Sequence, residues 1–104
     1  MVLMASVWAS RMVRSSRAGD KKFGRYTAEN YITSQFCNDQ LKKQNEKCYY
    51  CAGTMLYGEG VDRQTTREAA TIERIDNARG HTQDNCVLCC RKCQYINKQR
   101  RKKE

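Results

Sequence analysis

Hydrophobic residues recur with different spacings along this chain, and the spacing indicates which segments are helices and which are strands. A helix is predicted over residues 28–45, with Thr27 as its N-cap and Glu29 in its first turn. Its apolar positions recur at near-helical spacing: Ile32, Phe36 and Leu41. Cys37 lies among them, and we interpret it as a small buried hydrophobic residue.

The second half of the chain has shorter apolar segments separated by polar turns. Residues 53–68 contain three glycines and are predicted to form a loop or an irregular hairpin. Residues 69–75 (AATIERI) alternate in part and are predicted to be a strand, followed by a polar turn over residues 76–85. Residues 86–98 begin as a short apolar stretch and continue into a helix. This order of elements predicts an α+β domain.

The chain has 104 residues, of which 39% are hydrophobic, and its mean hydropathy is -0.89. This length fits one small domain and excludes a two-domain enzyme with a deep cleft. A core of this size is marginal without covalent or metal cross-links. No apolar run approaches the roughly 20 residues needed to span a bilayer, so we expect no membrane-spanning segment.

Seven cysteines provide the means for such cross-links. An odd number is unusual for a fully disulfide-bonded secreted domain, and the N-terminal residues lack the charge order of a signal peptide. We therefore predict a reducing intracellular compartment, namely the cytoplasm, the nucleus or a virus-associated environment. The cysteines are then expected to be metal ligands.

The spacing of the cysteines predicts a zinc site. Pairs separated by two residues place two sulfurs on one ion from a single turn. Two such pairs supply the four predicted ligands: Cys48, Cys51, Cys90 and Cys93. In this assignment Leu88 faces the core, and Cys86 and Cys89 are spare, buried thiols. A site that uses Cys86 and Cys89 is the alternative.

The formal net charge of +9 predicts a polyanionic partner, and nucleic acid is the commonest one. The positive charge lies at the two ends of the chain. Residues 1–25 hold six basic and one acidic residue, and residues 86–104 hold seven and one. The middle of the chain is slightly acidic, so we expect a core between two basic arms.

The N-terminal segment has three interpretations. Arg and Ser residues with no acid before Asp20 are typical of an organelle-targeting peptide, here residues 1–19. The same segment can be a loosely ordered arm that binds nucleic acid or a partner. Finally, it can be a short helix packed on the domain, because Trp8 and Met12 would share one helical face.

The segment TIERIDNARGHTQDNCVLCCRKC resembles the HNH endonuclease superfamily, and most closely its small phage- and virus-type members. Those members carry an Asp-Arg-Ile-Asp segment followed by Gly-aromatic-Thr and Asn. The resemblance covers residues 30–98 and implies a small zinc-stapled ββα-metal domain, in which two strands and a helix surround one catalytic metal. We divide the chain accordingly into a basic arm (residues 1–25), an HNH-like domain with a preceding helix (26–98) and a basic tail (99–104).

The resemblance also implies roles for individual residues. The acidic metal ligand falls on Glu73, and the first His of the HNH name, which activates water, falls on Arg74. The middle Asn, which orients that base and braces the loop, falls on Asn85, and the last His or Asn, a metal ligand, falls on Gln94. Glu73 and Gln94 would then hold Mg²⁺ or Mn²⁺ through oxygen atoms, with Asp76 as a further candidate. Otherwise Glu73 and Gln94 are a plain strand-end acid and a helix-start amide.

The base that the family uses needs a substitute in this chain. Arginine stays protonated, so Arg74 is expected to bind a phosphate and not to act as a base. His81 is the only histidine, and its ordinary pKa suits a general base near neutral pH. It lies four residues before Asn85, in the loop that crosses the implied site. The alternative is a loop histidine that only makes local hydrogen bonds.

Three functions are consistent with these patterns. The first is an HNH-type metal-dependent DNA endonuclease or nicking enzyme, which would act as a homodimer to cut both strands. The second is a nucleic-acid-binding module of the same fold without hydrolysis. The third is a zinc-stabilised structural protein, for example of a virus particle, whose arms contact other chains. In the first two, basic residues contact DNA phosphates without reading sequence: Arg74, Lys98, Arg100, Arg101, Lys102 and Lys103.

Overall fold

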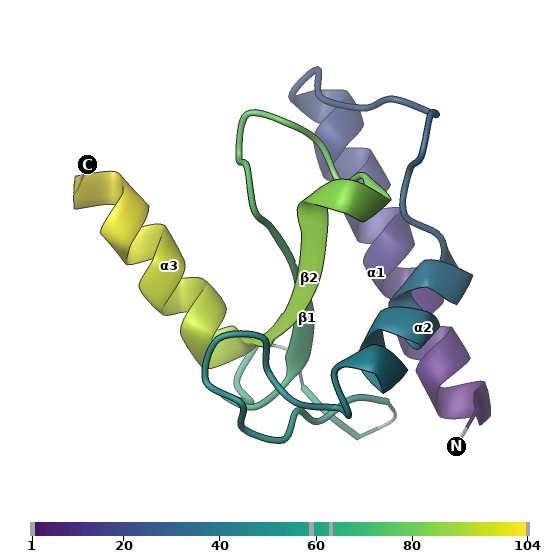
Figure 1. Cartoon of the computed structure of the whole chain (residues 1–104), viewed down its shortest axis with the longest axis vertical. Coiled ribbons are helices and arrows are strands. Elements are labelled where there is room, and N and C mark those ends of the chain that lie inside the picture. The colour runs from purple at the N-terminus through teal and green to yellow at the C-terminus, as the bar shows by residue number, and fades with distance from the viewer. Residues whose placement is uncertain (1, 59, 63, 104) are drawn as a thin grey trace.

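The computed structural model describes residues 2–58, 60–62 and 64–103, with the side chains of residues 2–6 and 99–103 left out. The fold consists of three α-helices, a short 3₁₀ turn and a two-stranded sheet in this described part (Figure 1). The elements follow one another in this order: α1 (Val2–Lys22), α2 (Ser34–Lys43), β1 (Ala70–Arg74), the 3₁₀ turn Gln83–Asn85, β2 (Cys86–Cys90) and α3 (Arg91–Lys103). The structure is therefore a small α+β fold, as the sequence predicts.

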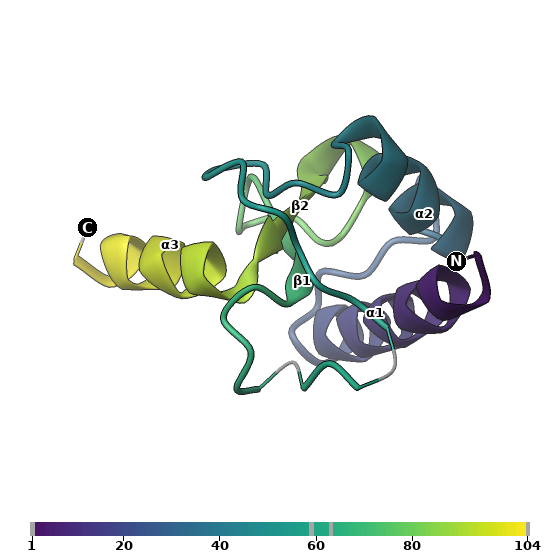
Figure 2. The same ribbon diagram turned by 90° about the horizontal axis from the view of Figure 1, so that it is seen from below.

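The two strands pair antiparallel and form the centre of the molecule. The register runs from Ala70 opposite Cys90 to Arg74 opposite Cys86. All five residues of β2 are buried, because helices cover the sheet from two sides. In both views α3 lies on one side of the strands, while α1 and α2 lie on the other (Figures 1 and 2). The predicted strand over residues 69–75 is confirmed to within one residue at each end.

Helix α1 joins the core through one face. Its buried residues are Trp8, Ala9, Met12 and Val13, with Asp20 near its C-terminal end. The indole Nε1 of Trp8 donates a hydrogen bond to the Ala70 carbonyl in β1, at 3.2 Å. The opposite face carries the exposed Arg11, Arg14 and Arg17. Of the three interpretations of this segment, a helix packed on the rest of the fold describes the structure.

Helix α2 is shorter than the sequence predicts. It begins at Ser34, with Thr33 as its N-cap accepting a hydrogen bond from the Phe36 amide at 3.0 Å. The predicted N-cap at Thr27 is wrong, because residues 27–33 are not helical. Asn30 adopts a left-handed φ of 54°, and Tyr31 pairs with Thr82 as an isolated β-bridge. A long-range pairing therefore overrides the local helical pattern of residues 28–33.

Helix α3 runs further than predicted. It continues from Arg91 to Lys103, through the segment that was expected to be a separate tail. The reason is local, because residues 98–103 (KQRRKK) are all good helix formers and contain no breaker. Among the described residues, no helix combines the length and the hydropathy that crossing a membrane requires.

Backbone groups of the hairpin that point away from the partner strand are bonded elsewhere. The side-chain amide of Gln44 accepts from the Leu88 N–H at 3.0 Å and donates to the Leu88 carbonyl at 2.9 Å. On β1, the Ala70 amide donates to the Leu56 carbonyl, and the Gln94 amide donates to the Ile72 carbonyl. Side chains and one backbone bridge at Leu56 thus take the place of further strands.

Candidate metal centre and histidine site

Four cysteine side chains meet where the sheet joins α3. Their sulfur atoms all lie within 4.8 Å of one another: Cys48, Cys51, Cys90 and Cys93. Cys90 ends β2 and Cys93 lies in the first turn of α3, so the strand-to-helix junction presents both sulfurs on one side. The other pair comes from a tight turn after α2, in which the Cys48 amide donates to the Gly53 carbonyl at 2.8 Å.

The turn around Cys48 also prepares its sulfur to carry negative charge. The amides of Tyr50, Cys51 and Cys90 donate to Cys48 Sγ at 3.4 to 3.5 Å. Burial alone would raise the pKa of this thiol, but the three N–H donors lower it to about 7. Ala52 reaches a left-handed φ of 61° to close the turn.

This donor set fits a zinc ion. Four soft sulfur ligands from two CxxC pairs match the tetrahedral coordination of structural zinc sites. The cluster can therefore hold such a metal, and it consists of the four residues that the sequence predicts. The other three cysteines are also buried, and burial raises the pKa of Cys37 and of Cys86 to about 12. Cys86 and Cys89 lie outside the cluster, so the alternative ligand set is not the one that the structure assembles.

The two residues that the resemblance assigns to a catalytic metal are engaged with their own neighbours. Glu73 is buried, and its Oε2 accepts from Asn97 Nδ2 of α3 at 3.2 Å. Gln94 donates its amide to Thr71 Oγ1 at 3.3 Å and to the Ile72 carbonyl. In the described part of the chain, the only group of three or more His, Cys, Asp or Glu side chains placed to share a metal is the cysteine cluster. No such group includes Glu73 in the described part, so the Mg²⁺ or Mn²⁺ site at Glu73 and Gln94 stays a prediction of the resemblance.

Arg74 closes the loop that follows β1. Its Nη1 donates to the Asn77 carbonyl at 2.8 Å and to the Arg79 carbonyl at 3.0 Å. Because neighbouring strand residues alternate sides, Arg74 lies on the opposite face of β1 from Glu73. Burial first, and then the nearby charge of Arg25, lower the pKa of the Arg74 guanidinium. Arg74 thus belongs to the side of the sheet that α1 covers.

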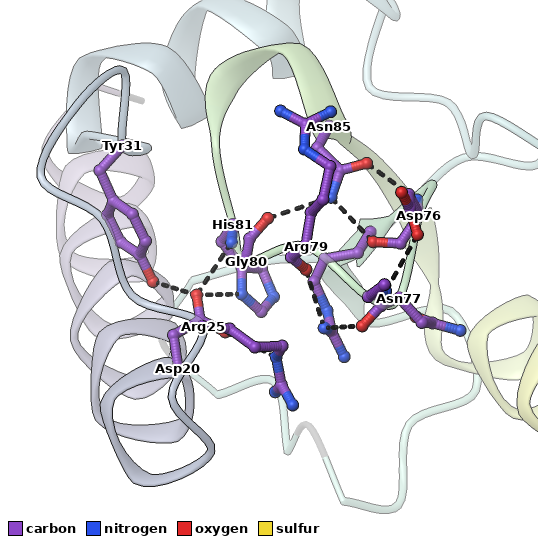
Figure 3. Close-up of polar contacts among 11 residues, drawn as sticks. Asp20, Arg25, Tyr31, Asp76, Asn77, Arg79, Gly80, His81 and Asn85 are labelled. Carbon is purple, nitrogen blue, oxygen red and sulfur yellow. Dashed lines mark hydrogen bonds and ion pairs between the residues drawn. The ribbon is translucent and has the colours of Figure 1, made fainter.

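Asn85 braces the same loop from its other end. Its Oδ1 accepts from the Asp76 amide at 2.8 Å, and its Nδ2 donates to the carbonyls of Asp76 and Gly80 at 3.0 Å each (Figure 3). Asp76 is exposed and caps the turn through the Ala78 amide at 3.0 Å. The loop that carries His81 is therefore held in a single conformation by hydrogen bonds.

The side chain of His81 meets a carboxylate from α1. Its Nδ1 lies 2.9 Å from Asp20 Oδ2, and its backbone N–H donates to the same oxygen at 2.8 Å. Tyr31 completes the set by donating its hydroxyl to Asp20 Oδ2 at 2.6 Å (Figure 3). Residues far apart in the sequence thus converge on one buried oxygen atom.

These contacts define the protonation of the pair. Burial would raise the pKa of Asp20, but the donors Tyr31 and His81 lower it below its ordinary value. An ionised carboxylate only accepts hydrogen bonds, so the Nδ1 of His81 carries the hydrogen and its Nε2 carries the lone pair. Burial lowers the pKa of His81 below its ordinary value; the hydrogen bond and charge of Asp20 oppose this effect, and the charges of Arg74 and Arg25 add to it. His81 is therefore neutral and basic at Nε2 near pH 7.

A pocket of about 250 Å³ opens beside this pair. Its wall includes Ser16 and Asp20 of α1, Arg25, His81 and Gln94. The Arg25 Nε lies 3.4 Å from Asp20 Oδ1, and neither atom has a hydrogen-bond partner among the described residues. The backbone of the His81 loop lies so close to Arg25 that a Cβ on Gly80 would meet the Arg25 carbonyl at 2.3 Å.

Sequence reasoning found His81 but missed its partners. It assigned no role to Asp20, Arg25 or Tyr31. One signal was present, since Asp20 lies seven residues after Val13 and eleven after Ala9, in the helical register of the buried face. Of the basic residues assigned to DNA, Lys98 is exposed on α3. The side chains of the remaining tail residues lie outside the described part: Arg100, Arg101, Lys102 and Lys103.

Comparison of the chain with models of known protein families, with curated proteins and with solved structures finds no match. The site is therefore interpreted from its own geometry.

Proposed function

We propose that this chain is a zinc-stabilised nucleic-acid-processing domain of the HNH type that hydrolyses a phosphodiester bond with His81 as the general base. The observation that carries this proposal is the 2.9 Å contact between His81 Nδ1 and Asp20 Oδ2 at the wall of a pocket. A carboxylate that fixes the tautomer of a histidine is a recurring way of orienting a catalytic base.

The proposed chemistry uses groups that lie around this pocket. The Nε2 of His81 takes a proton from a water molecule, and the water oxygen attacks the phosphorus atom as the bond to the leaving deoxyribose oxygen breaks. The leaving oxygen takes a proton from solvent water, and His81 releases its proton to solvent after the step. Arg25 lines the pocket, and Arg74 lies close enough for its charge to lower the pKa of His81. Their cationic side chains are suited to hold the non-bridging phosphate oxygens. No step of this proposal passes through a divalent metal at Glu73.

A plasmid-nicking assay tests the assignment. Wild-type protein is expected to convert supercoiled plasmid to the open-circular form, and His81→Ala is expected to lower the rate by about 100-fold or more, because a general base contributes that much. Glu73→Ala serves as the matched variant on the other face of β1, and each protein is assayed with and without added Mg²⁺ or Mn²⁺. Equal rates for His81→Ala and wild type would overturn the role of His81. Loss of nicking in Glu73→Ala alone would indicate that hydrolysis depends on a metal bound at Glu73 and not on His81.

The pH dependence of nicking provides an independent check. The base is active when neutral, and its pKa lies below 6.5, so the rate is expected to rise as pH rises through that pKa and to be level above pH 7. The profile is measured between pH 5 and 8 with the fraction of zinc-bound, folded protein determined at each pH. A rate that keeps rising between pH 7 and 8 would assign the titrating group to something other than His81.

A second function is favoured by the contacts of the residues carried over from the family. Arg74 is bonded to two loop carbonyls and Gln94 to β1, so both positions stabilise the fold. A module that binds nucleic acid without hydrolysis fits these contacts. It predicts salt-sensitive DNA binding and no nicking under any metal condition in the assay above.

A further inference from the structure

The turn that ends α1 presents an aromatic ring to solvent. Gly24 adopts a left-handed φ of 71°, the Arg25 amide donates to the Asp20 carbonyl at 2.8 Å, and the Gly24 amide donates to the Lys21 carbonyl. These are the two bonds of a Schellman motif, which terminates a helix in a defined geometry. The motif holds Phe23 with 63% of its surface exposed. A single exposed ring carries no argument by itself, but its setting among cations does.

Cations surround this ring and its neighbour. The Lys22 Nζ lies 5.6 Å and the Arg25 Cζ 5.1 Å from the centroid of the Phe23 ring. The Lys21 Nζ lies 5.0 Å from the centroid of Tyr26, which is partly exposed. We call these five residues, Lys21, Lys22, Phe23, Arg25 and Tyr26, the α1-turn platform.

The α1-turn platform is fixed by a ring contact, and the nearest carboxylate of α1 is buried and paired with Arg25. The Tyr26 ring packs against Tyr31, with centroids 4.9 Å apart and planes tilted by 56°. Asp20 is the only acidic residue among residues 1–25, and its carboxylate is fully buried behind Arg25. Three cations and two rings therefore face an exterior ligand without an exposed acid from the same segment.

We propose that the α1-turn platform binds an unpaired nucleotide, with its base stacked on Phe23 and its flanking phosphates held by Lys21, Lys22 and Arg25. Alternating rings and cations match the alternation of bases and phosphates in a single strand, and every base has a face that can stack. In a duplex the base faces are covered by neighbouring pairs, so the ring would gain nothing there. The proposal rests on the proposed function for its class of partner, and it specifies a single-stranded segment.

The position of Arg25 connects the α1-turn platform to the histidine site. Its guanidinium lies against Phe23, and its Nε lies 3.4 Å from Asp20 Oδ1 in the wall of the pocket. A nucleotide stacked on Phe23 would therefore place a neighbouring phosphate on the side of the His81 pocket. The platform would direct the chain toward single-stranded segments, such as the junction between paired and unpaired DNA.

Phe23→Trp provides a direct test in the full-length, zinc-bound protein. The only tryptophan of the wild type, Trp8, is buried, so a tryptophan at position 23 would report the exposed platform. Its fluorescence is expected to be quenched by a 15-nucleotide oligothymidine and left unchanged by a blunt-ended duplex of two complementary 15-nucleotide strands. Unchanged fluorescence with bound oligothymidine, or equal quenching by both ligands, would overturn the proposal.

Affinities measured by anisotropy of a labelled oligonucleotide complete the test. Phe23→Ala is expected to weaken binding of the single strand about tenfold and to leave the duplex affinity unchanged. Tyr95→Ala removes an equally exposed ring from α3 and is expected to change neither affinity. Poly-glutamate is the competitor for a purely electrostatic surface, and displacement by it at equal charge would contradict a nucleotide site.

The outcomes separate this inference from the proposed hydrolysis. If Phe23→Ala nicks plasmid and binds both ligands as wild type does, the platform proposal is wrong and the role of His81 stands. If single-strand binding depends on Phe23 but no protein nicks plasmid, the platform proposal stands and the proposed hydrolysis is wrong. Failure to bind any nucleic acid at low salt would overturn both.

Discussion

Cys48→Ser is expected to abolish the folded state under conditions in which the wild-type protein is fully folded. Cys48 is buried in the four-sulfur cluster and accepts three backbone hydrogen bonds, so its loss removes both a metal ligand and the centre of the turn. A structural zinc contributes about 10–16 kcal/mol at neutral pH, which is as large as the entire stability of a typical domain, about 5–15 kcal/mol. Small folds with few buried residues depend on such a cross-link.

Circular dichroism and metal analysis measure this effect together. The wild type should contain one zinc per chain and lose its helical signal when a chelator removes the metal. Cys37→Ala is the matched control, because Cys37 is equally buried but lies outside the cluster. It should keep the zinc and lose only about 1–3 kcal/mol of unfolding free energy. A wild-type chain that is folded and metal-free would contradict the assignment of the cluster.

Asp20→Ala is expected to lower the unfolding free energy by about 3–5 kcal/mol, the usual cost of removing one member of a buried charged network. The substitution leaves the Tyr31 hydroxyl, the His81 amide and the His81 ring without their shared acceptor. Each of these buried donors would then have to find water or remain unbonded. It also removes the contact that ties the C-terminal end of α1 to the loop.

Urea denaturation of the zinc-bound variants measures this loss. Tyr31→Phe removes a single donor and should cost less, about 1.5–3 kcal/mol for a hydrogen bond to a charged group. Asp84→Ala is the surface control, since Asp84 and Arg79 are about half exposed although they lie 2.8 Å apart. That variant should unfold at nearly the wild-type urea concentration. Equal unfolding free energies for Asp20→Ala and Asp84→Ala would show that the hydrogen bonds to Asp20 do not stabilise the fold.

Local patterns in the sequence were sufficient for the metal cluster and for the strand at residues 70–74. Two cysteines separated by two residues reach one ion from a single turn. The four ligands can therefore be identified without knowing the fold: Cys48, Cys51, Cys90 and Cys93. The start of α2 could not be identified in this way. Residues 28–33 have a helical pattern, but the segment turns at residues 28–30, and Tyr31 then pairs with Thr82 in place of continuing a helix. Such a pairing depends on residues about fifty positions away.

The histidine site shows the same division between local and distant information. The loop position of His81 follows from the turn-forming residues around it. Its partner Asp20 comes from α1, sixty-one positions earlier, and only the packing of that helix brings the two together. The family resemblance directed attention to Glu73 and Gln94, whereas the buried hydrogen bonds to one carboxylate gather around Asp20, in the pocket that Gln94 also lines.

The hydrogen bonds on the outer sides of the hairpin also affect how the protein behaves at high concentration. A two-stranded sheet has two exposed edges that would otherwise accept a strand from another molecule and begin aggregation. Here the Gln44 side-chain amide hydrogen-bonds the backbone of Leu88 on the outer edge of β2. The side chains of Trp8 and Gln94 donate to backbone carbonyls on the outer edge of β1. Side chains of α1, of α3 and of the C-cap of α2 therefore act as edge protection, and loss of α1 would uncover the Ala70 carbonyl for intermolecular strand pairing.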